Sequence, residues 1–242
     1  MRISKTRAVC GVAATALLLG CVATQPQLRQ FVPALLKATV MTVQITAGAA
    51  SVAVPMALIA ALMKMYGPLP LRWLAIGYIE VFRGTSALVQ LFWLFFVLPH
   101  FGVELQPVPA SIIALGLNIG AYGAEVVRGA LQAVARGQWE ATIALNMSFA
   151  TAMRRVIIPQ AVVAMIPPWG NLFIELLKST SLVSMITVAD LTFRAQQLNQ
   201  FTFKTVPIFT LVLLIYLIIA VLITFGFRTL EGRASQGIRR KS

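Results

Sequence analysis

Long apolar runs separated by short polar stretches follow one another along the whole chain. A helix needs about 20 apolar residues to cross a hydrocarbon layer, because it rises about 1.5 Å per residue. Six runs approach or exceed this length, and we predict spans over residues 8–24, 39–63, 74–98, 109–128, 156–177 and 206–227. The pattern therefore predicts an all-α membrane protein with five core transmembrane helices after one N-terminal apolar helix.

The first apolar run is the shortest and has more than one interpretation. Residues 1–30 hold a basic stretch, with Arg2, Lys5 and Arg7, followed by the run itself, an arrangement that is also typical of a signal peptide. The motif Leu18-Leu19-Gly20-Cys21 resembles a lipoprotein cleavage site, although Leu19 is bulky where a small residue is usual. We expect an uncleaved first span, with processing left open as the alternative.

The remaining predicted elements lie between and after the core spans. Residues 31–230 form the predicted transmembrane domain, in which Pro55 is expected to kink the second span. The stretch 178–205 is too polar to cross lipid, and we predict a short surface helix over residues 183–197. Residues 231–242 form a basic tail.

Composition and charge narrow the class and set an orientation. Hydrophobic residues make up 59% of the chain and charged residues 11%, which excludes an ordinary soluble domain. The net charge of +13 is interpreted through the positive-inside rule rather than as nucleic-acid binding. With both termini in the cytoplasm, fourteen of the 20 Lys and Arg residues lie on the inner side, and Arg83 falls within a span. The five on the outer side are Arg29, Lys37, Lys178, Arg194 and Lys204.

The polar stretch 129–155 between the fourth and fifth spans is therefore predicted to be cytoplasmic. Gly137 permits a tight turn, and residues 138–146 predict two turns of helix. Glu140 lies in the first turn, where the helix dipole favours a carboxylate. Ala141, Ala144 and Leu145 form a small apolar strip that suits a groove on a soluble partner. A solvated helix that merely connects two spans is the alternative.

Charged and amide side chains inside the spans are candidates for structure or for a solute path. Glu80 with Arg83, and Glu125 with Arg128, have the spacing of neutralising pairs on one helix face. Five polar residues are candidates for a substrate path: Gln90, Asn118, Asn171, Lys178 and Thr180. Hydrogen bonding between helices is an equal alternative for the amides, and snorkelling toward the head groups is one for Lys178.

Several short motifs, most of them in the second half of the chain, occur together in a combination that is typical of one family. The cytoplasmic stretch contains Glu140-Ala141-Thr142, Asn146, Val156 and Ile158-Pro159. Around it stand Arg128-Gly129, Arg136-Gly137-Gln138, Pro159-Gln160-Ala161, Pro167-Pro168, Gly170-Asn171, Leu177-Lys178-Ser179-Thr180-Ser181-Leu182 and, upstream, Glu80-Val81-Phe82-Arg83-Gly84-Thr85. Together they resemble the permease subunits of ABC importers for polar amino acids, the histidine/glutamine permease family.

The resemblance covers about residues 35–228 and implies the transmembrane domain of a type I ABC importer. In that family the loop helix docks on a separate nucleotide-binding subunit. The resemblance carries this ATPase-coupling role onto Gly137, Glu140, Ala141, Thr142, Asn146 and Pro159. It also implies a second permease subunit, for which we expect a heterodimer, and a secreted binding protein.

Three positions depart from the family pattern. Thr142 stands for the second Ala, Asn146 for the Gly at which the loop turns back, and Ser86 for a Pro. Asn tolerates left-handed backbone geometry better than most residues, so the turn can persist. The last two changes, with Tyr122-Gly123-Ala124-Glu125, resemble permeases of ectoine/hydroxyectoine importers, which adds these zwitterions to the expected substrates.

The chain has no phosphate-binding sequence Gly-x-x-x-x-Gly-Lys-Ser/Thr. We therefore expect no enzyme activity and no cofactor on this chain, with ATP and Mg bound by the partner ATPase. Cys10 and Cys21 have no metal-ligand spacing, and His100 is interpreted as a polar anchor at the membrane edge. Two other classes stay open: a transporter driven by an ion gradient, which would need carboxylates near the middle of its spans, and a structural subunit.

Overall fold

The structure is a computed structural model that describes residues 29–239 of the chain. The predicted first span over residues 8–24, its Leu18-Leu19-Gly20-Cys21 motif and the last three residues of the tail lie outside the described residues.

The described part of the chain is helical and contains no strand. In chain order its elements are α3 Val32–Tyr66, α4 Leu69–Gly84, α5 Ala87–Phe92, η1 Trp93–Val97, η2 Leu98–Phe101, α6 Pro107–Gln132, α7 Arg136–Ala144, α8 Phe149–Ala152, η3 Met153–Ile157, α9 Ile158–Ser179, η4 Thr180–Ile186, α10 Leu191–Thr202 and α11 Thr205–Arg239. Four stretches are long and apolar enough to span a membrane, and the bent pair Leu69–Gly84 and Ala87–Phe101, counted as one span, makes a fifth. The five predicted core helices are thus confirmed.

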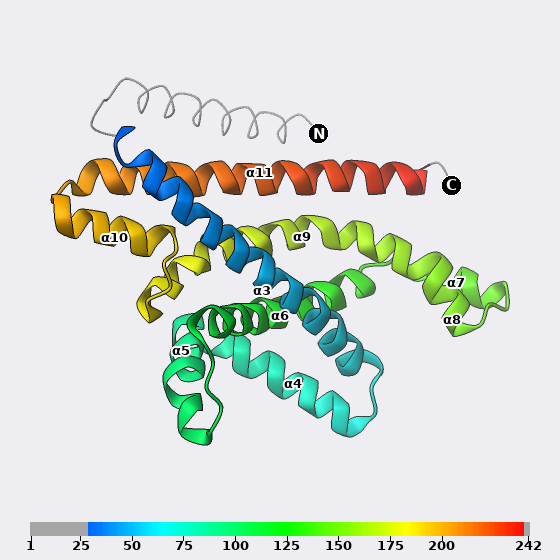
Figure 1. Cartoon of the computed structure of the whole chain (residues 1–242). Coiled ribbons are helices and arrows are strands. Elements are labelled where there is room, and N and C mark those ends of the chain that lie inside the picture. Colours follow the sequence, from blue (N-terminus) through cyan, green and yellow to red (C-terminus); the bar gives the residue numbers. More distant parts are fainter. Residues whose placement is uncertain (1–28, 240–242) are drawn as a thin grey trace.

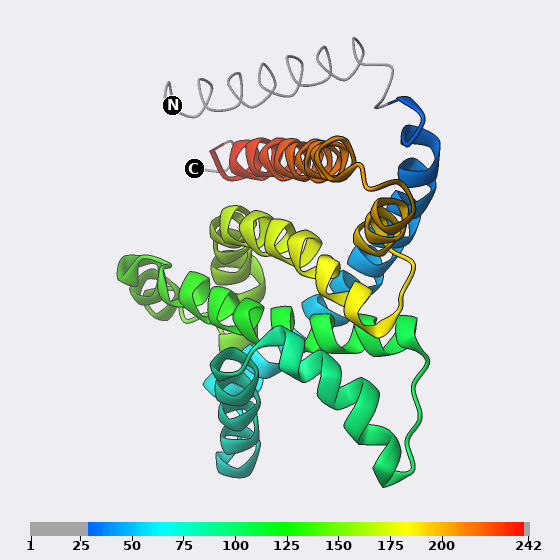
Figure 2. The same ribbon diagram turned by 90° about the vertical axis from the view of Figure 1, so that its left-hand side faces the viewer.

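The helices are stacked in three tiers, with short connections at both ends (Figure 1). α11 runs along one side, α3, α6 and α9 form the middle, and α4 and α5 project from the opposite side (Figure 2). α7 and α8 lie at one end of the bundle and α10 at the other. We call these the α7 end and the α10 end.

The third predicted span is wrong in its shape. Residues 74–98 are not one straight helix, because α4 ends at Gly84 and α5 begins at Ala87 with a bend of 108° between them. Thr85 and Ser86 adopt extended backbone conformations, which end the first helix. In contrast, α3 continues as one helix through Pro55.

The predicted surface helix over residues 183–197 is also wrong in its position. Thr180–Ile186 forms the tighter helix η4, with Val183 and Ile186 buried in the core. The regular helix begins at Leu191 and ends at Thr202. The helix starts there because Asp190 caps it, and Thr187, in left-handed conformation, ends the preceding turn. The predicted sixth span and the basic tail form one helix, α11, which runs to Arg239.

Small residues let α3 and α6 approach closely. Gly116, Gly120 and Gly123 lie on the face of α6 that contacts α3. A Cβ added at Gly116 would lie 3.0 Å from the backbone oxygen of Ala49, and one at Gly120 would lie 3.2 Å from that of Ala53. Without a hydrophobic effect to drive association inside lipid, such close packing is a main source of helix–helix stability.

We predict that Gly123→Leu disrupts this packing. A Cβ at Gly123 would lie 2.6 Å from the ring of Trp169 and 2.9 Å from Cβ of Ala57, both in the core. Overpacking of this kind costs about 1–3 kcal/mol, or more where rigid groups cannot move. The thermal midpoint of the detergent-purified protein should fall, whereas Gly129→Leu, on the same helix but facing open space, should leave it unchanged. Equal midpoints for the two variants would contradict the packing argument.

Candidate functional site

The α7 end presents a short helix that is anchored on one side and exposed on the other. Trp139 of α7 packs against the main hydrophobic core, and Thr142 is 4% exposed. The Thr142 hydroxyl donates to the Trp139 carbonyl oxygen at 2.7 Å. The Gln160 amide, at the start of α9, donates to Oε1 of Gln138 at 3.1 Å. Trp139 thus anchors α7 on the core, and the Gln160–Gln138 hydrogen bond connects it to the start of α9.

The exposed side of α7 is both apolar and acidic. Ile143 is 76% exposed and Leu145 is 74% exposed, with Phe149 of α8 beside them in the sequence at 60%. Ala141 and Ala144 are also exposed, and so is Glu140. We call Glu140, Ala141, Ile143, Ala144, Leu145 and Phe149 the α7 surface. Exposed apolar side chains gathered on a rigid helix, with one acid among them, are suited to a groove on another protein.

The structure places two predicted coupling residues differently from the local positions that we expected. Gly137 lies within α7 rather than at a turn, because the helix begins one residue earlier, at Arg136. Thr142 faces the core and so cannot contact a partner. Asn146 follows the helix with φ of 51°, in the left-handed conformation that Asn accommodates. Pro159 lies at the start of α9, directly after the π-helical turn η3.

Gln90 and Asn118 meet at the sharp bend between α4 and α5. Because α4 ends at the bend, the carbonyl oxygen of Phe82 has no helical donor four residues on. The Asn118 amide donates to it at 3.0 Å and the Gln90 amide at 2.9 Å. Asn118 also donates to Oε1 of Gln90 at 3.0 Å, and Gln90 donates to the Thr85 hydroxyl at 2.7 Å. We call these residues the bend brace.

The bend brace shows how a non-helical backbone is tolerated among apolar spans. An unsatisfied carbonyl in an apolar environment is costly, so protein groups must supply its hydrogen bonds. For these two amides, hydrogen bonding between helices, which the sequence offered as an equal alternative, is what the structure contains.

The other three candidate path residues, Asn171, Lys178 and Thr180, make no hydrogen bond to the bend brace in the described structure. Asn171 lines a small cavity of about 180 Å³ between α9 and α11, together with Thr224, Arg228 and Glu231. Lys178 is exposed near the end of α9. Thr180 is fully buried and donates to the Leu177 carbonyl oxygen at 2.7 Å, so its hydroxyl is already used within the fold.

Three comparisons with known proteins bear on these features. The family model for the binding-protein-dependent transport system inner membrane component matches residues 53–236. The chain belongs to this family. The glutamine transport system permease protein GlnP of Escherichia coli (strain K12) is 34% identical over 204 residues, which cover 84% of this chain and 93% of that protein. A probable amino-acid ABC transporter permease protein, y4tF of Sinorhizobium fredii, is 52% identical over 168 residues, 67% of this chain and 71% of that one.

A solved structure has the same fold as the permease. The crystal structure of an amino acid ABC transporter with histidines aligns with a TM-score of 0.81 at 37% identity, covering 86% of this chain and 97% of that one. The resemblance drawn from the sequence motifs is therefore confirmed. Of the three classes that the sequence left open, family membership supports the importer permease rather than an ion-gradient transporter or a structural subunit.

Charged residues of the permease near the α7 end form one network, and one predicted pair is absent from it. Glu125 accepts from Lys64 at 2.6 Å and from Arg128 at 2.7 Å, which confirms the pairing of Glu125 with Arg128 and ties α6 to the end of α3. Glu80 and Arg83 form no ion pair within the described residues. Arg83 instead lies over the ring of Tyr122, 5.4 Å from its centre.

Asp190 of the permease is a buried acid that the sequence reasoning missed. Its side chain is 0% exposed, and Oδ1 accepts from the Phe193 backbone N–H at 2.8 Å, capping α10. Oδ2 is buried with no hydrogen-bond partner in the described structure. Desolvation by burial therefore raises the pKa of this carboxyl, and the hydrogen bond from Phe193 opposes the rise only in part. The signal available in the sequence was an Asp, a residue type favoured at helix N-caps, directly before Leu191.

We predict that Asp190 makes the stability of the permease depend on pH. Because the folded pKa is higher than the unfolded one, near 3.9, the fold is most favoured below the unfolded value. That stability is lost as pH rises through the folded pKa. Asn also caps helices well, so Asp190→Asn should flatten the dependence of the thermal midpoint on pH while keeping α10 in place. Asp190→Ala should lose the cap as well, and an unaltered wild-type profile in Asp190→Asn would show that the carboxyl does not titrate.

Proposed function

We propose that the permease is one of two membrane subunits of an ATP-driven importer for a polar amino acid or a related zwitterion. Family membership supports the binding-protein-dependent importer, and the relatives support the substrate class, because their names include glutamine and L-cystine permeases. Ectoine and hydroxyectoine, suggested by Asn146 and Ser86, belong to the same class of small zwitterions and are the finer alternative.

The α7 surface is the observation that carries the proposal. It holds large apolar side chains, Ile143 and Leu145, that the fold leaves about three-quarters exposed. A separate ATP-binding subunit, with ATP and Mg bound on it, docks here and moves α7 as it closes. Trp139 and the Gln138–Gln160 hydrogen bond transmit this movement to α9, because they join the helix to the core and to the fifth span.

The proposed orientation in the membrane places the α7 surface on the side of the ATP-binding subunit. The permease lies in a bacterial inner membrane with the α7 end and both termini in the cytoplasm, as the excess of Lys and Arg on that side favours. A secreted binding protein delivers the solute at the α10 end. Asn171 and Lys178 are the proposed contacts along the path, since their side chains are exposed. A single set of five spans does not readily enclose a path, so a second permease, expected to be a different chain, completes it.

Reconstitution tests the proposal as a whole. The permease, its partner permease and the ATP-binding subunit are placed in phosphatidylcholine vesicles with the binding protein outside. We expect ATP-dependent uptake of radiolabelled solute when glutamine, cystine or ectoine is offered in turn with its binding protein. Uptake driven by a proton or sodium gradient without ATP would contradict the proposal.

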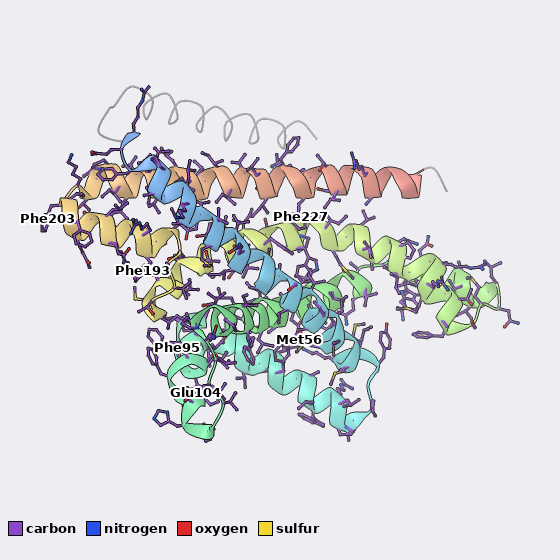
Figure 3. The ribbon with its side chains drawn as sticks, viewed as in Figure 1. Met56, Phe95, Glu104, Phe193, Phe203 and Phe227 are labelled. Atoms are coloured by element: carbon purple, nitrogen blue, oxygen red, sulfur yellow. The ribbon has the colours of Figure 1, made fainter. Side chains whose placement is uncertain are left out.

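Labelling tests the orientation separately. Ala144 is exposed on α7, so Ala144→Cys gives a thiol at the α7 surface. A membrane-impermeant maleimide should label it in inverted vesicles and not in intact cells. Glu104, in the loop after η2 at the α10 end (Figure 3), supplies the matched control, because Glu104→Cys should show the opposite pattern. Labelling of Ala144→Cys in sealed cells would place the coupling helix on the wrong side.

A further inference from the structure

A groove of about 550 Å³ lies between α3 and α10 at the α10 end. The two helices lie side by side in both views (Figures 1 and 2). Phe193, seen on α10 in Figure 3, contributes an aromatic wall, and Val40 and Met41 contribute apolar walls from α3. The cavity is distinct from the α7 surface and from the bend brace, and nothing in the proposed coupling mechanism uses it.

Two cations from different helices reach this groove. Lys37 comes from α3 and Arg194 from α10, and both are exposed. Arg194 donates to the uncharged Oε1 of Gln197 at 3.0 Å, and Lys37 has no ion pair within residues 29–239. No Asp or Glu is among the residues that line the groove. The groove therefore has two positive charges that the described part of the chain does not neutralise.

The groove extends from the membrane boundary into the apolar layer. Lys37 stands two residues before the predicted span 39–63, and Gln44 stands inside that span. At 1.5 Å per residue, their separation of seven positions covers about 10 Å of the helix. Val40 on the groove wall is 56% exposed, and it continues into an exposed apolar face with Leu36 and Val43. The groove is thus charged at its outer end and apolar below it along Val40 and Met41, with the amide of Gln44 beyond them.

This polarity decides between a protein and a lipid as the occupant. The rigid surface of a soluble protein cannot follow a groove into the hydrocarbon layer. A phospholipid has its charge at the boundary and its acyl chains below it, in the same order as Lys37 and Val40 along α3. The absence of acids from the lining excludes a cationic head group as the preferred ligand, because nothing there would neutralise its charge.

We propose that this groove binds an anionic phospholipid of the outer leaflet. Lys37 and Arg194 hold the head-group phosphate, and the amide of Gln197, which lies beside Arg194 on α10, donates to a remaining oxygen. One acyl chain lies along Val40 and Met41. The bound lipid fills the space between α3 and α10, and so supports the position of α10, on which the binding protein is proposed to dock. The lipid site itself does not depend on which solute the permease carries.

Lipid titration tests the site. The purified full-length permease in phosphatidylcholine–detergent micelles is titrated with a fluorescent phosphatidylglycerol. Each basic residue near a membrane surface contributes about fivefold to the affinity for an anionic lipid, so Lys37→Gln or Arg194→Gln should each weaken binding about fivefold and the double variant about 30-fold. Lys204→Gln, which removes an exposed lysine near the same end and outside the groove, should have no effect. Inorganic phosphate should not displace the lipid, because it lacks the acyl chains.

A variant that fills the groove distinguishes lipid binding inside the groove from nonspecific attraction of anionic lipid to the two cations. Ala34 lines the groove, so Ala34→Trp should abolish binding of the lipid although both cations are kept. The thermal midpoint in pure phosphatidylcholine confirms that each variant is folded. Full phosphatidylglycerol binding by Ala34→Trp or by the double variant would overturn the proposal. The proposal would also be overturned if these groove variants lost affinity for the binding protein in pure phosphatidylcholine but still bound phosphatidylglycerol. The groove would then be a docking site for the binding protein rather than for a lipid.

Discussion

Glu140→Lys should abolish ATP-driven uptake while the amount of permease in the membrane stays unchanged. Glu140 is exposed on α7, so its replacement leaves the core intact and reverses a charge at the centre of the α7 surface. Charge reversal at a docking surface puts like charges together, and we expect affinity for the ATP-binding subunit to fall by about 30-fold or more. Vesicle uptake, ATP turnover stimulated by the binding protein and co-purification of the ATP-binding subunit measure the three consequences.

The matched control for this variant lies at the opposite end of the molecule. Glu104 is equally exposed, and Glu104→Lys makes the same charge change away from α7 (Figure 3). It should leave co-purification of the ATP-binding subunit unaltered. Ile143→Asp tests the apolar part of the same surface and should also weaken docking, because it replaces an apolar side chain that is 76% exposed with a charged one. Normal uptake by Glu140→Lys would remove the docking hypothesis.

Asn118→Leu should destabilise the permease more than any other single change at the bend. The variant removes one donor from the Phe82 carbonyl and leaves Oε1 of Gln90 without the donor it has at 3.0 Å. The Phe82 carbonyl keeps its bond from Gln90, but the part-buried Oε1 of Gln90 loses its donor from Asn118, and a lost hydrogen bond of this kind costs about 1 kcal/mol. The thermal midpoint of the purified protein should fall, and the region around residues 84–87 should exchange its amide hydrogens faster.

The same helix offers the control for this prediction. Gln106 precedes α6, is exposed and makes no side-chain capping bond, so Gln106→Leu removes an amide without breaking a contact. Its free energy of unfolding should stay within about 0.5 kcal/mol of the wild-type value, so the thermal midpoint should hardly change. If Asn118→Leu behaved like Gln106→Leu, the bend would have to be stabilised by something other than the amides.

Local pattern was enough to predict much of the fold and part of the site. The apolar runs that became α3, α6, α9 and α11 were predicted because a lipid solvent forces each span to satisfy its own backbone and to be apolar along its length. The motif around Glu140 located the candidate docking helix. Its exposed residues Ile143 and Phe149 were missed, since a sequence does not show which side of a short helix the core will cover.

Other features depended on contacts between residues far apart in the chain. The run 74–98 is mostly apolar, although Glu80 and Arg83 lie within it, and Gly84-Thr85-Ser86 was the local sign that its helix could break. Gln90 and Asn118 looked equally suited to a path or to a helix contact, because only the packing of α6 against the bend showed which carbonyl they would meet. Gly137 and Thr142 were assigned to docking by motif, whereas packing places one inside the helix and the other against the core.

The sequence by itself determined the membrane class, the number of core spans, the family resemblance and the location of the candidate coupling helix. These follow from the solvent, from hydrogen bonds within each helix and from short motifs, all of which are local. The tertiary structure decided the 108° bend and its amide brace, the burial of Asp190, the exposed side of α7 and the charged groove between α3 and α10. Each of these arises where two elements meet, and which side chains meet there is set by packing rather than by the order of residues along the chain.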